Sequence, residues 1–175
     1  MKHKNAGIKK IISKNEIQKK VCELAKRINK DYYKKDLIVL SVLSGSVVFC
    51  SDIIRKLDVN FKLDFIKVSS YKGKKSADKI RLNFPFNYDV ENKDVLIVED
   101  IYDTGKTLSY LKSFLAEKKA RSVAFCVLVD KKIKKKSRVK IKYCGFSVGN
   151  KFIVGYGLDF NEKFRGLPYI GALGD

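Results

Sequence analysis

Short apolar runs alternate along the chain with stretches in which apolar residues recur every three or four positions. Four runs have the length and composition of buried or half-buried strands: residues 37–43, 61–69, 95–99 and 122–129. Three stretches have helical spacing: residues 13–30, 47–57 and 107–118. Because strands and helices alternate, the pattern predicts an α/β domain whose twisted sheet is mainly parallel and flanked by helices.

The two ends of the chain and one internal segment depart from this alternation. Ser13 and Glu16 form a capping box that predicts the start of the first helix. Residues 143–175 contain glycines at irregular intervals and short strand-like pieces, a pattern too irregular for another strand and helix. Residues 70–80 are rich in lysine and contain little that can be buried, so we expect a flexible loop there, and residues 80–84 can return as a strand. The length of 175 residues predicts a single domain, 1–175.

The net charge of +19 is the unusual feature of the composition, and it suggests a nucleic-acid partner. The lysines are scattered along the chain, however. This favours an A·T-rich coding genome, rather than selection for a binding face, as the explanation of the excess of lysine. Basic residues crowd together only at 131–142. The four cysteines show no metal-binding spacing, no apolar run is long enough to span a membrane, and no secretory signal is evident. These features predict a soluble, cytoplasmic protein with reduced thiols.

Residues 95–108 contain the chemistry that the alternation places at a sheet edge. The buried run 95–98 leads into the adjacent carboxylates Glu99 and Asp100, and ligands of parallel sheets bind beyond the carboxyl ends of the strands. Asp103 and Gly105 follow in a short polar turn, whose backbone amides can converge on an anion at the start of the next helix. The segment therefore predicts a site for a phosphate and a sugar.

Three other interpretations of these residues are weaker. A nucleoside-triphosphate loop ending in Gly105, Lys106 and Thr107 requires a glycine where this chain has Asp100. The aspartic protease triplet Asp103-Thr104-Gly105 continues into a strand in proteases, whereas here helical spacing follows. A simple solvated turn leaves two adjacent acids at a strand end without a ligand, which is electrostatically unfavourable.

The segment resembles the phosphoribosyl pyrophosphate motif of the type I phosphoribosyltransferases. From about residue 12 to residue 173 the chain is similar to the 6-oxopurine (hypoxanthine) branch of that family. Four stretches carry the resemblance: Val42 to Ser46, Val68 to Tyr71, Val95 to Leu108, and Phe152 to Asp159 continuing to Arg165. The resemblance implies the type I fold, with a small hood subdomain made from about residues 1–15 and 143–175 over the site.

The resemblance also implies a role for individual residues. Asp103 matches the general base that handles the purine N7 proton. Ten residues match contacts to phosphoribosyl pyrophosphate: Ser44, Gly45, Glu99, Asp100, Asp103, Thr104, Gly105, Lys106, Thr107 and Arg165. Four match the purine site: Lys131, Phe152, Ile153 and Asp159. Glu99 and Asp100 match carboxylates that contact the ribose hydroxyls directly or through Mg²⁺, and Asp159 matches a second Mg²⁺ ligand. Ser70 and Tyr71 match the start of the flexible loop.

Several alternatives stay open at this level. Lys132 can replace Lys131 as the donor to the purine oxygen. Phe152 can instead be an ordinary aromatic residue of the hydrophobic core, without a role in binding. The family usually has lysine where this chain has Ser44, in a loop whose Leu43-Ser44 peptide is expected to be cis.

The implied function is Mg²⁺-dependent purine salvage, in which hypoxanthine, and also guanine, reacts with phosphoribosyl pyrophosphate to give the nucleoside monophosphate and pyrophosphate. The implied partners are small-molecule substrates and other copies of the chain, in a homodimer or homotetramer, with no membrane. The strongest rival is an RNA-binding regulator built on the same fold, because the net charge suits that role. An enzyme of this class that acts on xanthine or on a pyrimidine is a second rival.

Overall fold

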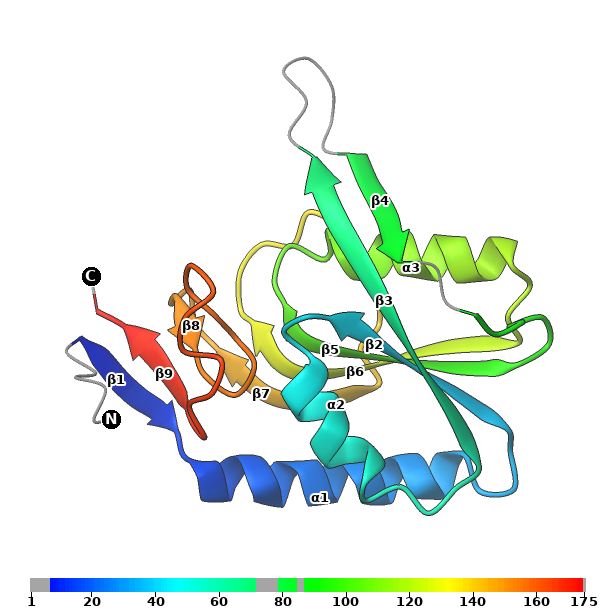
Figure 1. Ribbon diagram of the computed structural model, residues 1–175, viewed down its shortest axis with the longest axis horizontal. Coiled ribbons are helices and arrows are strands. Elements are labelled where there is room, and N and C mark those ends of the chain that lie inside the picture. Colours follow the sequence, from blue (N-terminus) through cyan, green and yellow to red (C-terminus); the bar gives the residue numbers. More distant parts are fainter. Residues whose placement is uncertain (1–6, 72–78, 85–86, 175) are drawn as a thin grey trace.

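The computed structural model describes residues 7–71, 79–84 and 87–174, and its elements form two sheets (Figure 1). The larger sheet has six strands in the order β4-β3-β2-β5-β6-β7, and all neighbours are parallel except β3 and β4. The smaller sheet is antiparallel, in the order β1-β9-β8. The predicted α/β fold with a mainly parallel sheet is therefore confirmed.

Most element bounds agree with the expected ones. The larger sheet contains the strands β2 (Leu37–Leu43), β3 (Phe61–Tyr71), β4 (Lys79–Phe84), β5 (Asp94–Tyr102), β6 (Ser122–Lys131) and β7 (Tyr143–Val148). The helices are α1 (Lys14–Asp31), α2 (Val47–Ile54) and α3 (Lys106–Glu117). The smaller sheet contains β1 (Ile8–Ile12), β8 (Ile153–Val154) and β9 (Ile170–Leu173). Helix α2 is one turn shorter than predicted, and β5 extends three residues beyond the expected end at Glu99.

Helix α1 begins where the sequence predicts, because both halves of the capping box form. The Ser13 hydroxyl accepts from the Glu16 backbone N–H at 3.3 Å, and the Glu16 carboxylate accepts from the Ser13 backbone N–H at 2.8 Å. These hydrogen bonds satisfy amides that have no partner within the helix. The side of α1 that faces the sheet buries its apolar positions completely, including Ile17, Val21 and Ile28.

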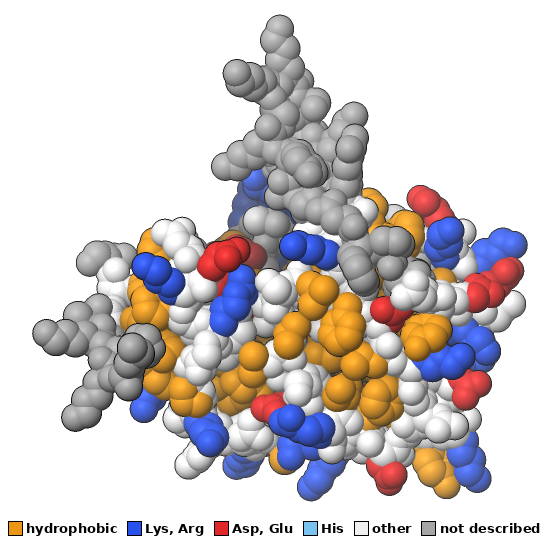
Figure 2. All heavy atoms as spheres, viewed as in Figure 1, with side chains coloured by type: hydrophobic (Ala, Val, Ile, Leu, Met, Phe, Trp, Pro, Cys, Tyr) orange, Lys and Arg blue, Asp and Glu red, His pale blue; other side chains and the backbone are white. Residues whose placement is uncertain are grey.

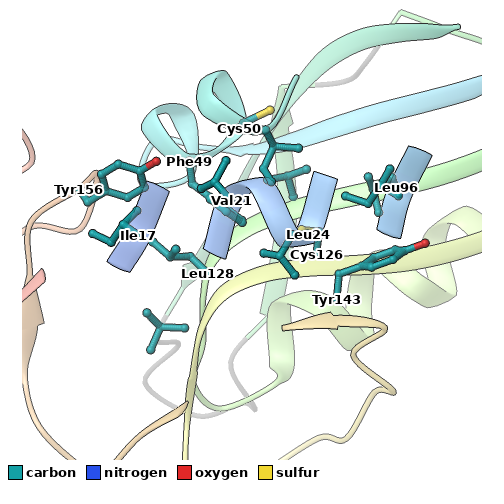
Figure 3. Close-up of a cluster of buried hydrophobic side chains, with 14 of the residues drawn as sticks. Ile17, Val21, Leu24, Phe49, Cys50, Leu96, Cys126, Leu128, Tyr143 and Tyr156 are labelled. Carbon is teal, nitrogen blue, oxygen red and sulfur yellow. The ribbon is translucent and has the colours of Figure 1, made fainter. Parts of the chain in front are cut away.

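The sheet has a hydrophobic core on each face, because successive side chains of a strand point to opposite sides. In β2, Leu37 and Val39 pack into the core beneath α1 and α2, whereas Ile38 and Leu40 pack into the core beneath α3. Figure 3 shows the first of these cores, in which side chains from α1 and α2 gather with side chains from the strands β5 and β6. Fixed packing on both faces holds the carboxyl ends of the strands in place.

The smaller sheet joins the two ends of the described chain and lies beside one end of the larger sheet (Figure 1). Its boundary differs from the expected one. The sequence pattern predicts that the hood begins near residue 143, but β7 pairs in parallel with β6 at the edge of the larger sheet, from the pair Cys126 and Tyr143 to the pair Lys131 and Val148. The C-terminal contribution to the smaller sheet therefore begins only at Ile153. Among the described helices, none is long and apolar enough to cross a bilayer.

Candidate active site

Two adjacent carboxylates lie near the carboxyl end of the central strand β5. Glu99 is 7% exposed and Asp100 is 9% exposed. Burial raises the pKa of the Glu99 carboxyl well above its usual value, and the neighbouring charge of Asp100 raises it further. Both residues lie inside the strand rather than after it, because β5 stays paired with β6 as far as Tyr102. Two adjacent buried carboxyl groups are suited to a ligand with hydroxyl groups or to a cation.

The chain then makes the predicted turn and enters α3. Gly105 is the residue before the helix, and it adopts a φ of 83°, a conformation that favours glycine. As a glycine, it has no side chain that could cap the helix. The amides of a first helical turn have no acceptor within the helix, and such a turn is a common place for an anion to bind. A pocket of about 150 Å³ opens at this turn, and it is lined by Glu99 and by residues 101–105, 107 and 108.

A larger hollow of about 280 Å³ lies at the opposite edge of the sheet, where β2, β3 and β5 begin. Its walls include Asp36, Asn60 and Lys93. We assign the site to the smaller pocket for a physical reason. Ligands of open parallel sheets bind at the carboxyl ends of the strands, where helix N-termini converge, and the larger hollow lies at the amino ends.

The loop after β2 closes against the carboxylates. The peptide bond between Leu43 and Ser44 is cis, as the resemblance implies. A Cβ atom added to Gly45 would lie 1.8 Å from Oδ2 of Asp100, so the backbone of this loop rests directly on the acid. A Cβ atom on Gly157, which has a φ of 101°, would lie 2.0 Å from the carbonyl oxygen of Gly45. Three segments far apart in the sequence therefore meet here, and two of them approach through glycine.

Asp159 and Arg165 are paired near this junction. The Arg165 guanidinium contacts the Asp159 carboxylate at 2.8 Å and donates to the carbonyl of Gly157 at 2.7 Å. The other Asp159 oxygen accepts from the Glu162 backbone N–H at 2.9 Å. Over the described residues, no three acidic, histidine or cysteine side chains gather into one metal-binding group. Glu99, Asp100 and Asp159, the three predicted metal-associated residues, are thus not brought together as one ligand set.

Lys131, one of the predicted purine-binding residues, lies beside the turn. The Lys131 side chain is only 12% exposed, and its ammonium lies 3.8 Å from the Asp103 carboxylate. Lys132, the alternative donor, is 62% exposed and pairs instead with Asp130 at 2.8 Å. The structure therefore favours Lys131.

Phe152 is 51% exposed, which excludes a role as a core aromatic. Its ring makes an edge-to-face contact with Phe160, with centroids 5.3 Å apart, and the next residue, Ile153, is buried in β8. An exposed aromatic ring that is held by another ring is suited to stacking on a planar ligand.

Not every predicted residue can be placed. Ser70 and Tyr71 end β3, but their side chains and most of the expected flexible loop 70–80 lie outside the described residues. Sequence reasoning also missed two residues. Phe160 braces Phe152, and the Lys135 ammonium is inserted beside the turn. Nothing in the sequence singles out Lys135, because it is one of eight basic residues in the segment 131–142.

The fold and this site together define a phosphoribosyltransferase. The family model described as the phosphoribosyl transferase domain matches residues 8–161, and the chain belongs to this family. The match covers all of the segments that converge on the pocket except the end of the loop that contains Arg165.

Within the family the chain is similar to enzymes that act on purines. It is 39% identical to the hypoxanthine-guanine phosphoribosyltransferase of Staphylococcus aureus, over 93% of this chain and 92% of the relative. It is 41% identical to the bifunctional protein TilS/HprT of Listeria innocua over 94% of this chain, but it spans only 26% of that longer relative.

Solved structures show the same relationship. A hypoxanthine phosphoribosyltransferase from Staphylococcus aureus superposes with a TM-score of 0.91 at 37% identity, covering 96% of this chain and 92% of that one. A hypoxanthine-guanine-xanthine phosphoribosyltransferase superposes with a TM-score of 0.89 at 37% identity, covering 97% and 99%. The predicted family and fold are therefore confirmed.

Proposed function

We propose that the chain transfers the 5-phosphoribosyl group of phosphoribosyl pyrophosphate to hypoxanthine and to guanine. The bond between the ribose C1 and a pyrophosphate oxygen breaks, a bond from C1 to the purine N9 forms, and the purine loses one proton. The products are the nucleoside monophosphate and pyrophosphate. The observation that carries the proposal is the ion pair of Lys131 with Asp103, at 3.8 Å, beside a phosphate-binding turn.

The residues of β5 and of the turn bind the sugar phosphate. Thr104, Gly105, Lys106 and Thr107 surround the 5′-phosphate with backbone amides and hydroxyls at the start of α3. Glu99 and Asp100 lie along the ribose, where adjacent buried carboxylates accept hydrogen bonds from its hydroxyls. Ser44, Gly45 and Arg165 lie toward the pyrophosphate, and the contact of Gly45 with Asp100 fixes the distance between the two halves of the donor.

The purine lies between Phe152 and the turn. Phe152 stacks on the base, and the backbone of Ile153 and the hood near Asp159 contact its edge. Lys131 donates to the exocyclic oxygen at C6. Adenine has an amine there, so a largely buried ammonium would face a donor instead of an acceptor, which is the kind of mismatch that gives strong discrimination. Asp103, 43% exposed and close to Lys131, accepts the N7 proton as N9 attacks.

The donor set also fits a magnesium ion. Mg²⁺ is usually bound by one or two carboxylates together with waters and substrate phosphates, so the adjacent acids Glu99 and Asp100 suffice without a complete protein cage. Asp159 reaches a metal only if Arg165 shares or releases it. When bound, Mg²⁺ neutralises charge on the departing pyrophosphate. We further propose that the enzyme works in the cytoplasm as a homodimer or homotetramer.

A panel of bases tests the proposal. Radiolabelled hypoxanthine, guanine, xanthine, adenine and uracil are each incubated with the protein, phosphoribosyl pyrophosphate and Mg²⁺, and labelled nucleotide is separated from base. We expect product from hypoxanthine and guanine and none from adenine or uracil.

Salt-dependent RNA binding without nucleotide formation would instead identify the RNA-binding regulator. On the face of the molecule in Figure 2, Lys and Arg side chains lie among apolar and acidic ones and form no single basic patch, which argues against that alternative.

A further inference from the structure

Lys135 is the inward-pointing residue of the lysine-rich segment 131–142. Its side chain is only 10% exposed, whereas the neighbouring residues Lys134 and Lys136 are exposed. A lysine is rarely buried unless it is paired, because its ammonium must be removed from water. The position therefore needs an explanation other than the general basic composition of the chain.

Two hydrogen bonds and one ion pair hold the ammonium in place. It donates to the carbonyl of Tyr102 at 2.7 Å and to the carbonyl of Lys131, and it lies 3.0 Å from Oδ1 of Asp130. It also lies 4.3 Å from the centroid of the Tyr102 ring, within range of a cation–π interaction. Two of its three N–H groups therefore donate to backbone carbonyls, and the Asp130 carboxylate balances its charge.

These acceptors are at the point where two neighbouring strands separate. The pairing of β5 with β6 ends at Tyr102 and Asp130, and the chain continues from these two residues to Asp103 and Lys131. The Tyr102 carbonyl belongs to the peptide group that includes the Asp103 amide. Beyond the last paired residues of β5 and β6, the Lys135 ammonium connects the two chains in place of backbone hydrogen bonds. It thereby fixes the backbone next to Asp103 and at Lys131, the two residues of the ion pair.

Residues next to Lys135 strengthen the same connection. The backbone amides of Lys136 and Ser137 donate to the carbonyl of Thr104 at 3.0 and 3.1 Å. The carbonyl of Ser137 accepts from the Tyr102 hydroxyl at 3.3 Å, and a Cβ atom on Gly105 would lie 1.8 Å from that same carbonyl. The backbone next to Lys135 therefore packs directly against the phosphate-binding turn.

We propose that Lys135 is a positioning residue for the phosphoribosyl transfer, and the proposal rests on the proposed function. Lys135 touches neither substrate. It sets the separation of the Asp103 carboxylate from the Lys131 ammonium, so the proton acceptor and the donor to the purine oxygen meet N7 and the neighbouring oxygen at C6 on one edge of the base. A misplacement of about 1 Å between reacting groups can cost about 10²-fold in rate.

The test compares Lys135→Met, Lys135→Arg and the matched control Lys134→Met. Methionine keeps an unbranched chain of similar length but has no donor, arginine keeps the charge and the donors, and Lys134 is exposed on the same segment. Steady-state kinetics are measured with hypoxanthine and with phosphoribosyl pyrophosphate varied separately, at least about 15 °C below the melting temperature of each variant as a margin chosen to keep it folded.

We expect Lys135→Met to lower kcat by about 10- to 100-fold and to raise the KM for hypoxanthine, with the KM for phosphoribosyl pyrophosphate changed by less than about twofold. Lys135→Arg should recover most of the loss, and Lys134→Met should match the wild type. If Lys135→Met does not fold, Lys135→Gln replaces it under the same criteria.

Three results would overturn the assignment: an unchanged kcat in Lys135→Met, a parallel rise in both KM values, or a loss that Lys135→Arg does not relieve. Each would leave Lys135 with a structural role only. Failure of the proposed function is distinguishable, because the wild type itself would then form no nucleotide from a 6-oxopurine.

Discussion

Replacing Gly45 by alanine tests whether the close contact between the β2 loop and the acid of β5 is needed for catalysis. The added Cβ atom would lie 1.8 Å from Oδ2 and 2.7 Å from Cγ of Asp100, whereas Cβ atoms in proteins essentially never come within 3.0 Å of such neighbours. The loop or the carboxylate must therefore move by more than about 1 Å. The φ of Gly45 lies outside the left-handed region, so the methyl group strains the contact and not the backbone dihedral.

The size of the effect follows from that displacement. Overpacking of a close contact costs about 1–3 kcal/mol, and a shift of about 1 Å in a positioning group costs about 10²-fold in rate, which corresponds to about 2.7 kcal/mol. We therefore expect the kcat/KM for phosphoribosyl pyrophosphate to fall by about 10²-fold in Gly45→Ala. Stability should change by no more than about 3 kcal/mol, so the variant should still fold.

The assay is nucleotide formation with hypoxanthine in excess and the donor varied, together with thermal unfolding. Gly149→Ala is the matched control, because Gly149 is exposed, lies outside the left-handed region and has no other atom within 4 Å of the place that an added methyl group would take. A kcat/KM of Gly45→Ala within twofold of the wild type would show that the contact has no catalytic role. An equal loss in Gly149→Ala would show that the effect does not come from the contact.

Three further predictions concern the charged groups of the site. Asp103→Asn should lower kcat by about 10²-fold and leave the KM for phosphoribosyl pyrophosphate nearly unchanged, and an unaltered kcat would refute the role of general base. Lys131→Met should lower the kcat/KM for hypoxanthine by about 10²-fold and reduce the preference over adenine in the same base panel. Glu99→Gln should reduce activity. It should also raise the melting temperature at neutral pH, by about 2–4 °C for each kcal/mol of unfavourable burial free energy that the neutral amide removes. Because the folded-state pKa of Glu99 is raised, the folded chain keeps a proton that the unfolded chain releases above about pH 4.5, so stability falls as pH rises from there to the folded-state pKa. The increase in melting temperature of Glu99→Gln should therefore vanish below about pH 4.5, where Glu99 is protonated in both states. Equal melting temperatures of the variant and the wild type at pH 7 would contradict the reasoning.

Local patterns were sufficient to predict the elements that hold the site. The capping box located the start of α1, and the run of apolar residues before Glu99 located the central strand, because both signals depend on neighbours within a few positions. The pairing of β7 could not be predicted in this way. Its residues include a glycine and no long apolar run, and their place in the sheet depends on β6, beyond the basic segment.

The roles of individual lysines also depend on distant contacts. Lys131 and Lys135 differ from their neighbours only in what lies against them, namely Asp103 for the first and the carbonyl of Tyr102 for the second. Phe152 shows the same limit, because only its exposure in the folded chain distinguishes a stacking surface from a core residue. Sequence indicates the chemistry available in such a segment, and tertiary structure selects the side chain that uses it.

The glycine in front of α3 has a consequence for turnover. In an ordinary helix a serine or aspartate oxygen fills the place in front of the first amides, but here that place is left for a phosphate monoester. Donor and nucleotide product carry the same 5′-phosphate, so the product keeps the contacts with the turn that bound the donor. The nucleotide product must therefore leave before the next donor molecule can bind. The mononucleotide should act as a competitive inhibitor toward phosphoribosyl pyrophosphate.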